Sequence, residues 1–573
     1  MRSELRVLRR LALAFGLLVA ATTAHGQAGM PRSGVSYDPP PVVGGPDATA
    51  ASDAAEPEDS RNGRATRPGR ARSDVQAYLE FAQVLSAELD GGETFTYSSV
   101  AAGVDGQIQT RRVRAQASYR YQRNIEWSGD VADSDIHSGI ARVNADIVPG
   151  ALQFDAGALA TRTGGVGRAL GVTDRDDSTE VYSIYAGPTL ATHVGPVAVN
   201  AAYRLGYTAV DDEAFLGFGD DYDDSITHSA TGSIGMGPGR LPFGWTVGAG
   251  HMRSDSGGPF DYRFEGTFVR GDVVVPVSPT LALTAGVGYE QLESSQIDLA
   301  RDANGLPVVG PDGRAVPDPS RPRLLTYDVD GLIYDGGLIW RPTPRTELTA
   351  RAGHRYGGTT IVGTFRHQFR RGFGVTAAVF DTVETFGGTL IANLNNLPTD
   401  FDILRNPFTG DLGNCAIGGQ EPGSGQCFAS SLQSIRGTSY RMRGASILFS
   451  GSRGLWDFGF GAGYAHRRFA RPDDPAFDSF GGREDESFQV FGSVGRELSR
   501  TSQLGFDAYA SWYSSDPDAF GDVTTIGGTL SYSRTFLFDR LQLIAALGLY
   551  HTDGSLIDST VATGLIGLRY TFW

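Results

Sequence analysis

The stretch VATGLIGLRYTFW, Val561–Trp573, shows the alternation that decides the fold. Ile566, Leu568 and Tyr570 fall on one face of an extended chain, and Arg569 falls on the other. Successive side chains of a β-strand point to opposite faces, so this segment is predicted to be a strand with one apolar face. A strand that separates lipid from a polar lumen needs this arrangement.

The same period of two continues toward the N-terminus as far as residue 75, for example in 538–551 and 111–123. The predicted strands are about 11 to 15 residues long, and short connections mostly alternate with long ones. A soluble β-sandwich would have shorter strands and no reason for such alternation. We therefore expect an all-β fold, a transmembrane antiparallel β-barrel of about 22 strands, with a range of roughly 18 to 24.

Composition agrees with a barrel and argues against several other classes. Hydrophobic residues make up 40% of the 573 residues, which is adequate because only alternate strand residues must face lipid. The net charge of −16 argues against nucleic-acid binding. The histidines are scattered singly, without a metal-binding or catalytic motif. We expect neither an enzyme nor a bound metal or cofactor.

The chain begins with four arginines among its first ten residues, followed by a short apolar run, Leu11–Thr22. This order is typical of an export signal peptide, predicted for residues 1–26. Residues 27–74 are rich in Pro and mixed charge without apolar periodicity, which predicts a disordered periplasmic linker. The barrel is expected over residues 75–573, in the outer membrane of a Gram-negative bacterium.

Aromatic residues close the last predicted strand, at Tyr570, Phe572 and Trp573. Many outer-membrane barrels end in an aromatic residue, with another two positions earlier, and the barrel-assembly machinery reads this signal. Here the apolar face ends at Phe572, and Trp573 extends one residue beyond it. We predict that the three residues form the assembly signal.

Arginines recur at positions assigned to the lumen. Arginine keeps its charge and can hold a water-filled wall in a fixed field that favours anionic or polar solutes. The alternative is that these arginines pair with strand acids such as Asp155 and Glu347 and only make the barrel rigid. The lumen-facing basic residues are predicted to be Arg112, Arg114, Arg120, Arg142, Arg351, Arg355, Arg366, Arg370, Arg441 and Arg443.

The connection 388–436 stands apart, because it combines great length, apolar residues and the two cysteines of the chain, Cys415 and Cys427. So apolar a loop should not lie uncovered in water. We predict that it folds over or into the lumen, pinned by a Cys415–Cys427 disulfide, and constricts it. A TonB-dependent transporter would instead place a large globular plug before the first strand, and the segment 27–74 is too short for one.

Acidic residues crowd three expected outer loops, 163–177, 209–224 and 469–484. Carboxylates bind hard cations, and divalent ions bridge lipopolysaccharide at that surface. Ordinary solvated loops are the alternative, because the acids lack regular ligand spacing. Outer-membrane lipid and lipopolysaccharide are the expected partners of the exterior.

The stretch Trp340–Leu348, with Arg355–Gly358 and Phe365–Arg371, resembles a family of Gram-negative outer-membrane barrels found with exosortase (PEP-CTERM) and exopolysaccharide systems. Similar chains often carry the label preprotein translocase subunit YajC, although YajC itself is a short single-helix protein that nothing here fits. The resemblance implies a role at the outer membrane in polymer or protein export, with export-system components as partners.

Together these features predict a porin-like channel for polar solutes, or part of a polymer or protein export system. The alternative is a barrel with a closed lumen that serves a structural or surface-interaction role. The sequence does not name the cargo.

Overall fold

The computed structural model describes residues 72–572, except for 92–93, 129–133, 165–177, 213–221, 304, 306, 311–315, 370–371, 419–422, 473–483, 517–521 and 555–556. The predicted signal peptide, residues 27–71 of the predicted linker, Trp573 and most of the three acidic loops lie outside these residues. Residues 72–74, assigned to the linker, belong instead to the first strand.

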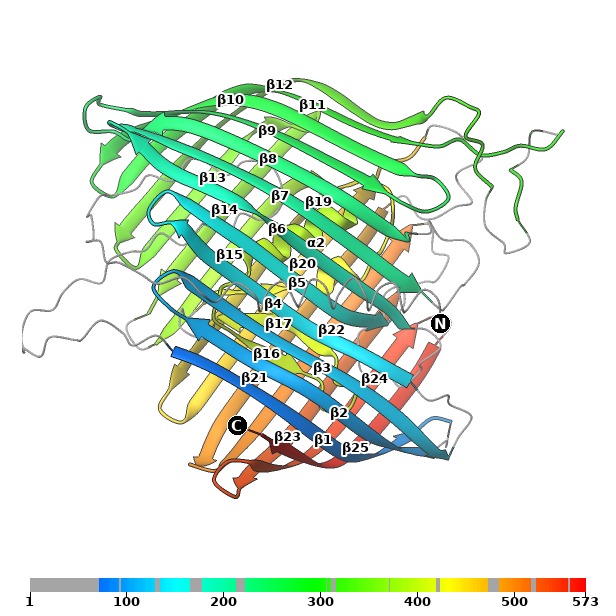
Figure 1. Cartoon of the computed structure of the whole chain (residues 1–573). Helices are drawn as coiled ribbons and strands as arrows, with labels where there is room; N and C mark the ends of the chain where they lie inside the picture. Colours follow the sequence, from blue (N-terminus) through cyan, green and yellow to red (C-terminus); the bar gives the residue numbers. More distant parts are fainter. Residues whose placement is uncertain are drawn as a thin grey trace, which may run out of the picture. The chain divides into compact units, whose positions relative to one another are not determined.

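Twenty-two antiparallel strands form one sheet that surrounds the lumen (Figure 1). They are β1 (Arg72–Glu88), β2 (Thr94–Gln109), β3 (Val113–Ser128), β4 (Ser134–Val148), β5 (Leu152–Gly164), β6 (Ser178–Val194), β7 (Val197–Asp212), β8 (Asp224–Met236), β9 (Gly244–Ser256), β10 (Tyr262–Ser278), β11 (Leu281–Gln296), β12 (Leu324–Thr343), β13 (Thr346–Arg355), β14 (Gly358–Gln368), β15 (Phe373–Glu384), β19 (Tyr440–Arg453), β20 (Trp456–Phe469), β21 (Glu484–Ser499), β22 (Ser502–Asp516), β23 (Val523–Phe536), β24 (Leu541–Gly554) and β25 (Ile557–Thr571).

The barrel closes between its first and last strands. β1 pairs with β2 on one side and with β25 on the other, with Tyr78 opposite Thr571 and Glu88 opposite Val561. Closure leaves no sheet edge at this junction, which is how strands can cross a bilayer. The predicted fold class and strand number are therefore confirmed.

The exterior has the apolar surface that a bilayer requires. On β25 the predicted apolar face points outward, where Ile566 is 66% exposed, whereas the neighbouring Leu565 is 4% exposed and points inward. Outward aromatic residues such as Trp340, Trp456 and Tyr570 lie near the end with the short turns. Among the described residues, no helix combines the length and apolar character needed to span a bilayer. The strands form a barrel of the outer membrane, with short turns at the periplasmic end and longer loops outside.

The strand pair β13–β14 is much shorter than β12 beside it. β12 has 20 residues, whereas β13 has 10 and β14 has 11. The pair ends early because Tyr356 and Gly357, both with positive φ, form a tight two-residue turn at the end where long loops are the rule. The hairpin therefore ends well short of the outer end of β12, and residues 324–333 of β12 pair only with β11.

The connection between β15 and β19 is folded rather than irregular. It contains helix α2 (Phe386–Asn396), a small sheet of β16 (Phe401–Arg405), β17 (Leu412–Gly418) and β18 (Gly425–Cys427), and a short helix α3 (Ala429–Leu432). In Figure 1, α2, β16 and β17 lie inside the ring of barrel strands. We refer to residues 385–439 as the plug.

Candidate functional site: the plugged lumen

Helix α2 forms the apolar anchor of the plug. Thr385 caps its N-terminus, accepting a hydrogen bond from the Gly388 amide at 3.2 Å. Phe386, Leu390 and Leu394 recur at intervals of four, so they share one helix face, and each is completely buried. They pack against lumen side chains of β4 to β6, namely Ile140, Leu159, Val181 and Tyr185. The expectation that the apolar loop enters the lumen is confirmed.

Truncating the anchor should loosen the plug. Leu390→Ala is expected to weaken its packing by about 2–5 kcal/mol, because the side chain is completely buried and leaves a cavity. Trypsin cleavage after Arg405, timed in the intact barrel, measures how often the plug opens. Leu332→Ala, on the lipid-facing side of β12, is the control and should leave the cleavage rate unchanged. Equal rates for the two variants would contradict the assigned packing.

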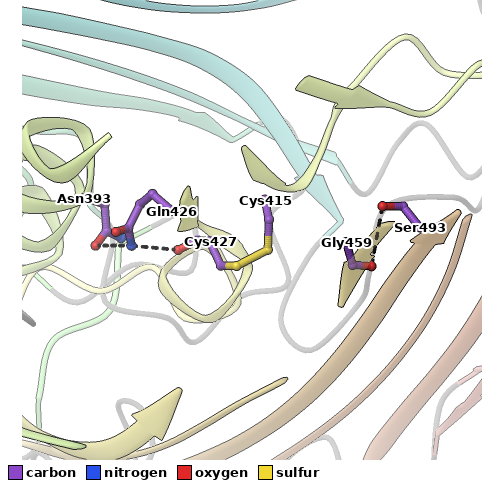
Figure 2. Close-up of a disulfide and its surroundings, with 6 residues drawn as sticks. All are labelled: Asn393, Cys415, Gln426, Cys427, Gly459 and Ser493. Atoms are coloured by element: carbon purple, nitrogen blue, oxygen red, sulfur yellow. Dashed lines mark hydrogen bonds between the residues drawn. A yellow bond between two sulfur atoms is a disulfide. The ribbon is translucent and has the colours of Figure 1, made fainter. Parts of the chain in front are cut away.

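A disulfide joins two strands of the plug's own sheet. Cys415 on β17 lies opposite Cys427 on β18, and the two are bonded (Figure 2). The neighbouring Gln426 donates through Nε2 to Oδ1 of Asn393 on α2 at 3.1 Å. The disulfide fixes the sheet and the hydrogen bond connects the sheet to the helix, so the plug behaves as one folded unit.

Buried polar contacts attach the plug to the wall. Arg162 of β5 makes a two-pronged ion pair with Asp411 of the plug, at 3.0 and 3.1 Å. From the plug, Arg405 donates to the Ser118 and Ser138 hydroxyls at 2.9 and 2.6 Å. Charge-assisted, two-pronged hydrogen bonds are among the stronger polar contacts in proteins. They hold the plug on the side of β3 to β5.

The opposite end of the plug contacts β20. Arg467 bonds the carbonyl of Ser430 in α3 and pairs with Asp485 of β21 at 3.1 Å. Neither charged side chain is more than 1% exposed. Removing either partner of so completely buried a pair would leave an unpaired buried charge, which is strongly destabilising.

Burial perturbs two titratable groups of the plug. It raises the pKa of the Asp402 carboxyl, and the nearby Asp400 and Asp457 add to the shift. Burial also lowers the pKa of the Arg405 guanidinium. Both shifts follow from moving charge out of water, as expected for a segment enclosed in the lumen.

The predicted lumen arginines lie in several different environments. Arg120 pairs with Glu80 at 2.7 Å, and Arg142 pairs with Asp155 at 3.2 Å while also donating to plug carbonyls. Arg351 bridges Asp272 and Asp335, and Arg355 pairs with Glu290. Arg114 and Arg366 lie on the lumen side of β3 and β14. Arg112 lies in the turn between β2 and β3, and Arg370 lies outside the described residues.

The lumen assignment is wrong for Arg443, whereas Arg441 contacts a cluster of lumen side chains. Met442 and Leu448 are the buried, inward residues of β19, whereas Ile447 points outward and is exposed. Strand alternation therefore places Arg443 on the outward face. Arg441 lies at the outer end of the same face, but Val383 opposite it is buried with Met252 and Phe264 of the lumen wall, and the Arg441 guanidinium lies over the Tyr356 ring of that cluster. Asp381, directly opposite Arg443 on β15, shares this face and pairs with both arginines.

Several charged residues at the site were not predicted. Arg162, Arg204, Arg270 and Arg467 all make buried lumen ion pairs, and Asp411 is the plug partner of the first. Arg204 and Arg467 could have been found from alternation within their strands. The Arg162–Asp411 pair could not, because it depends on where a folded loop meets a distant strand.

Lumen charges become more exposed toward the periplasmic end. There, the side chains of the pair Arg341–Glu347 are 38% and 36% exposed, and those of Arg569–Asp105 are 25% and 42% exposed. Higher in the barrel, Arg162–Asp411 is 10% and 1% exposed. The plug nevertheless reaches toward this end, because Phe401 bonds the Gln116 side chain near the start of β3 and the Gly423 amide donates to Ser450 near the end of β19.

The C-terminal aromatics complete the wall at the periplasmic end. The Tyr570 and Phe572 rings meet edge to face with centroids 5.3 Å apart, and the Phe572 amide donates to the Ala77 carbonyl at 2.9 Å. This contact closes the last strand onto the first. Recognition of these residues by the assembly machinery stays a prediction.

The fold and its lumen define a class, an outer-membrane β-barrel plugged by one of its own loops. No protein-family model matches the chain, and no curated protein matches it. Solved structures with a similar strand arrangement include the FrpB iron transporter from Neisseria meningitidis, with 10% identity, 87% of this chain and 83% of that chain covered, and a TM-score of 0.44. The siderophore receptor PiuA from Acinetobacter baumannii has 10% identity and a TM-score of 0.41, and the match covers 86% of this chain and 82% of the receptor. The alcaligin outer-membrane receptor FauA from Bordetella pertussis has 12% identity and a TM-score of 0.36, and the match covers 86% of this chain and 76% of the receptor.

Proposed function

We propose that this chain is an outer-membrane transport channel for polar solutes, kept nearly closed by its plug. The observation that carries the proposal is a contrast within the lumen wall: the ion pairs Arg341–Glu347 and Arg569–Asp105 are partly exposed, whereas Arg162–Asp411, which the plug completes, is buried. Barrels of this width enclose a lumen too large for wall side chains to fill alone. The partly exposed pairs mark the part of the lumen wall that the plug leaves open to solvent.

The exposed part of the lumen wall favours polar cargo without a strong preference for charge sign. Its arginines face carboxylates, as in Arg341–Glu347 and Arg569–Asp105, so positive and negative groups alternate across short distances. Such a wall attracts dipolar, hydroxyl-rich solutes more than single ions. The resemblance to barrels of exopolysaccharide systems supports the same class of cargo. It favours transport in the direction of export, with a polar polymer as the cargo.

A closed structural barrel is the second candidate, because the plug is held by buried charges on both sides of the lumen: Asp411 of the plug pairs with Arg162, and Arg467, itself paired with Asp485, bonds the Ser430 carbonyl. Single-channel conductance of the refolded barrel separates the two functions. A channel should show small, brief openings that become larger or more frequent when the Cys415–Cys427 disulfide is reduced. The double variant Cys415→Ser/Cys427→Ser is the control and should not respond to reductant. A silent bilayer before and after reduction would reject the channel and favour the closed barrel.

A further inference from the structure

The inner face of β23 is lined with hydroxyl groups along nearly its whole length. Thr525 and Thr529 are buried and point into the lumen, whereas Ile526, next to Thr525, is 52% exposed and points toward lipid. The same alternation continues the inward face to the periplasmic end through three further hydroxyl residues, Ser531, Ser533 and Thr535. From Thr525 onward, this face carries neither a charged nor an apolar side chain.

One row of hydroxyl groups at this wall is buried without a hydrogen-bond partner. Thr525 lies opposite Ser511 on β22 and opposite Thr552 on β24, and all three side chains point inward. Their exposed fractions are 0%, 6% and 2%, and none of the three hydroxyl groups makes a hydrogen bond within the described residues. Burying a hydroxyl group without a partner is costly, so such groups usually bind ordered water. We call Ser511, Thr525 and Thr552 the hydroxyl row.

A second strand with inward hydroxyl groups, β8, forms a contrast to the hydroxyl row. Ser225 and Thr227 lie on its inward face and are as buried as the row. Ser225 bonds the Tyr222 hydroxyl at 2.6 Å, and Thr227 bonds the Ser254 hydroxyl at 3.0 Å. Thr385 of the plug donates to Ser254 at 3.1 Å. On this side the plug and the wall therefore satisfy each other's hydroxyl groups without water.

Two tyrosine rings border the hydroxyl row on its periplasmic side. Gly527 follows Thr525 on the inward face of β23, and it lies between Tyr509 on β22 and Tyr550 on β24. A side chain at Gly527 would meet the two rings at 2.6 and 2.7 Å, so both rings lie over the glycine. The plug contacts this pair through Phe408, whose ring meets that of Tyr550 edge to face with centroids 6.2 Å apart. The rings therefore separate the hydroxyl row from the hydroxyl groups nearer the periplasm.

We propose that the hydroxyl row binds a neutral, hydroxyl-rich solute, such as a sugar or polyol, on a water-filled route past the plug. The site rests on the proposed channel function and adds the route and the class of cargo. Each hydroxyl group of the row both donates and accepts, so the row can replace the water around a solute's own hydroxyl groups. The tyrosine rings offer the apolar face against which a sugar ring packs.

The surroundings of the row favour a neutral solute over an anion. The inward faces of β22, β23 and β24 carry no arginine along their described residues, so no guanidinium group selects an anion there. Asp507 of β22 lies opposite Thr529, on the periplasmic side of the rings. Its carboxylate can accept hydrogen bonds from the same hydroxyl-rich solute.

The reactivity of an introduced cysteine tests whether water and solute reach the row. The two native cysteines are joined in the disulfide, so Thr525→Cys supplies the single free thiol of the chain. In the full-length barrel embedded in bilayers, the small uncharged reagent methyl methanethiosulfonate should modify Thr525→Cys about tenfold faster than Thr227→Cys, because thiol reactivity follows access to solvent. Thr227 is the matched control, since it is equally buried but has a hydrogen-bond partner. Equal rates for the two variants would overturn the water-filled route.

Competition during the same reaction tests the class of solute. Arabinose should slow the modification of Thr525→Cys severalfold, because its hydroxyl groups occupy the row. Betaine at the same concentration has no hydroxyl group and should not slow the reaction. Equal protection by arabinose and betaine, or protection by neither, would overturn the assignment of a hydroxyl-rich solute.

The tyrosine rings are tested by removing one of them. Tyr550→Ala should speed the modification of Thr525→Cys severalfold, because it opens the periplasmic side of the row. The same substitution should leave the rate at Thr227→Cys unchanged, since β8 lies on the other side of the plug. An unchanged rate at Thr525→Cys would contradict the closure of the row by the rings.

The row and the channel can fail separately. Correct folding of each variant is checked by heat-dependent migration in gel electrophoresis. A conducting barrel in which Thr525→Cys does not react would reject the row and keep the proposed channel. A silent bilayer combined with a reactive, arabinose-protected Thr525→Cys would reject the channel and support the row as a solute-binding site.

Discussion

Replacing residues 388–436 by a short Gly-Ser linker is expected to raise the single-channel conductance of the barrel about tenfold or more. The replacement removes α2 and the disulfide-bonded sheet from the lumen but keeps every barrel strand and the strand pairing of β15 with β19. What remains is a 22-stranded wall around an aqueous lumen, as in wide outer-membrane barrels. Planar-bilayer recording of the two refolded proteins measures the difference.

The control for this deletion is a second long loop. Residues 298–322 connect β11 to β12 outside the plug, and replacing them by the same linker should leave the conductance near the wild-type value. If both deletions gave the same conductance, the plug would not be the constriction.

The second large effect is expected at the buried ion pair between β20 and β21. Arg467→Met should lower the free energy of unfolding by about 3–5 kcal/mol, because Asp485 would be left as an unpaired buried charge. The substitution also removes the hydrogen bond from Arg467 to the Ser430 carbonyl of the plug. Unfolding in urea, followed by loss of the compact form on gels, measures the change.

Arg468→Met is the matched control, one residue away on the opposite face of β20. Its side chain is 74% exposed and pairs with Glu484, so the loss should stay below about 1 kcal/mol. The double variant Arg467→Met/Asp485→Leu should recover much of the stability, because no buried charge then lacks a partner. Equal losses at Arg467 and Arg468 would contradict the assigned burial.

Local patterns predicted the barrel because each strand carries its own evidence. Alternation in Val561–Trp573 placed Ile566 and Leu568 outward without knowledge of any neighbour. The position of the plug was also predictable in outline, because apolar residues such as Leu390 in a long connection need cover. These features depend on chemistry within one segment.

Features that depend on how distant segments meet were not predicted. The lumen assignment of Arg443 failed because charge was taken to indicate the inward face, although Met442 and Leu448 carry the apolar side chains of the inward face. Asp381, which interrupts the apolar face of β15, was the available signal. An outward acid needs an outward partner, and Arg443 opposite it provides one.

Amide hydrogen exchange of α2 in the intact barrel, embedded in bilayers, tests the central claim most directly. An 11-residue helix is only marginally stable in water by itself, so exposed amides of Phe386–Asn396 would exchange within seconds. If the helix is packed in the lumen, these amides should be protected almost as strongly as those of β6 and β7, and Leu390→Ala should reduce that protection. Fast exchange in the wild-type barrel, at the rate of a free peptide, would contradict a lumen filled by the plug.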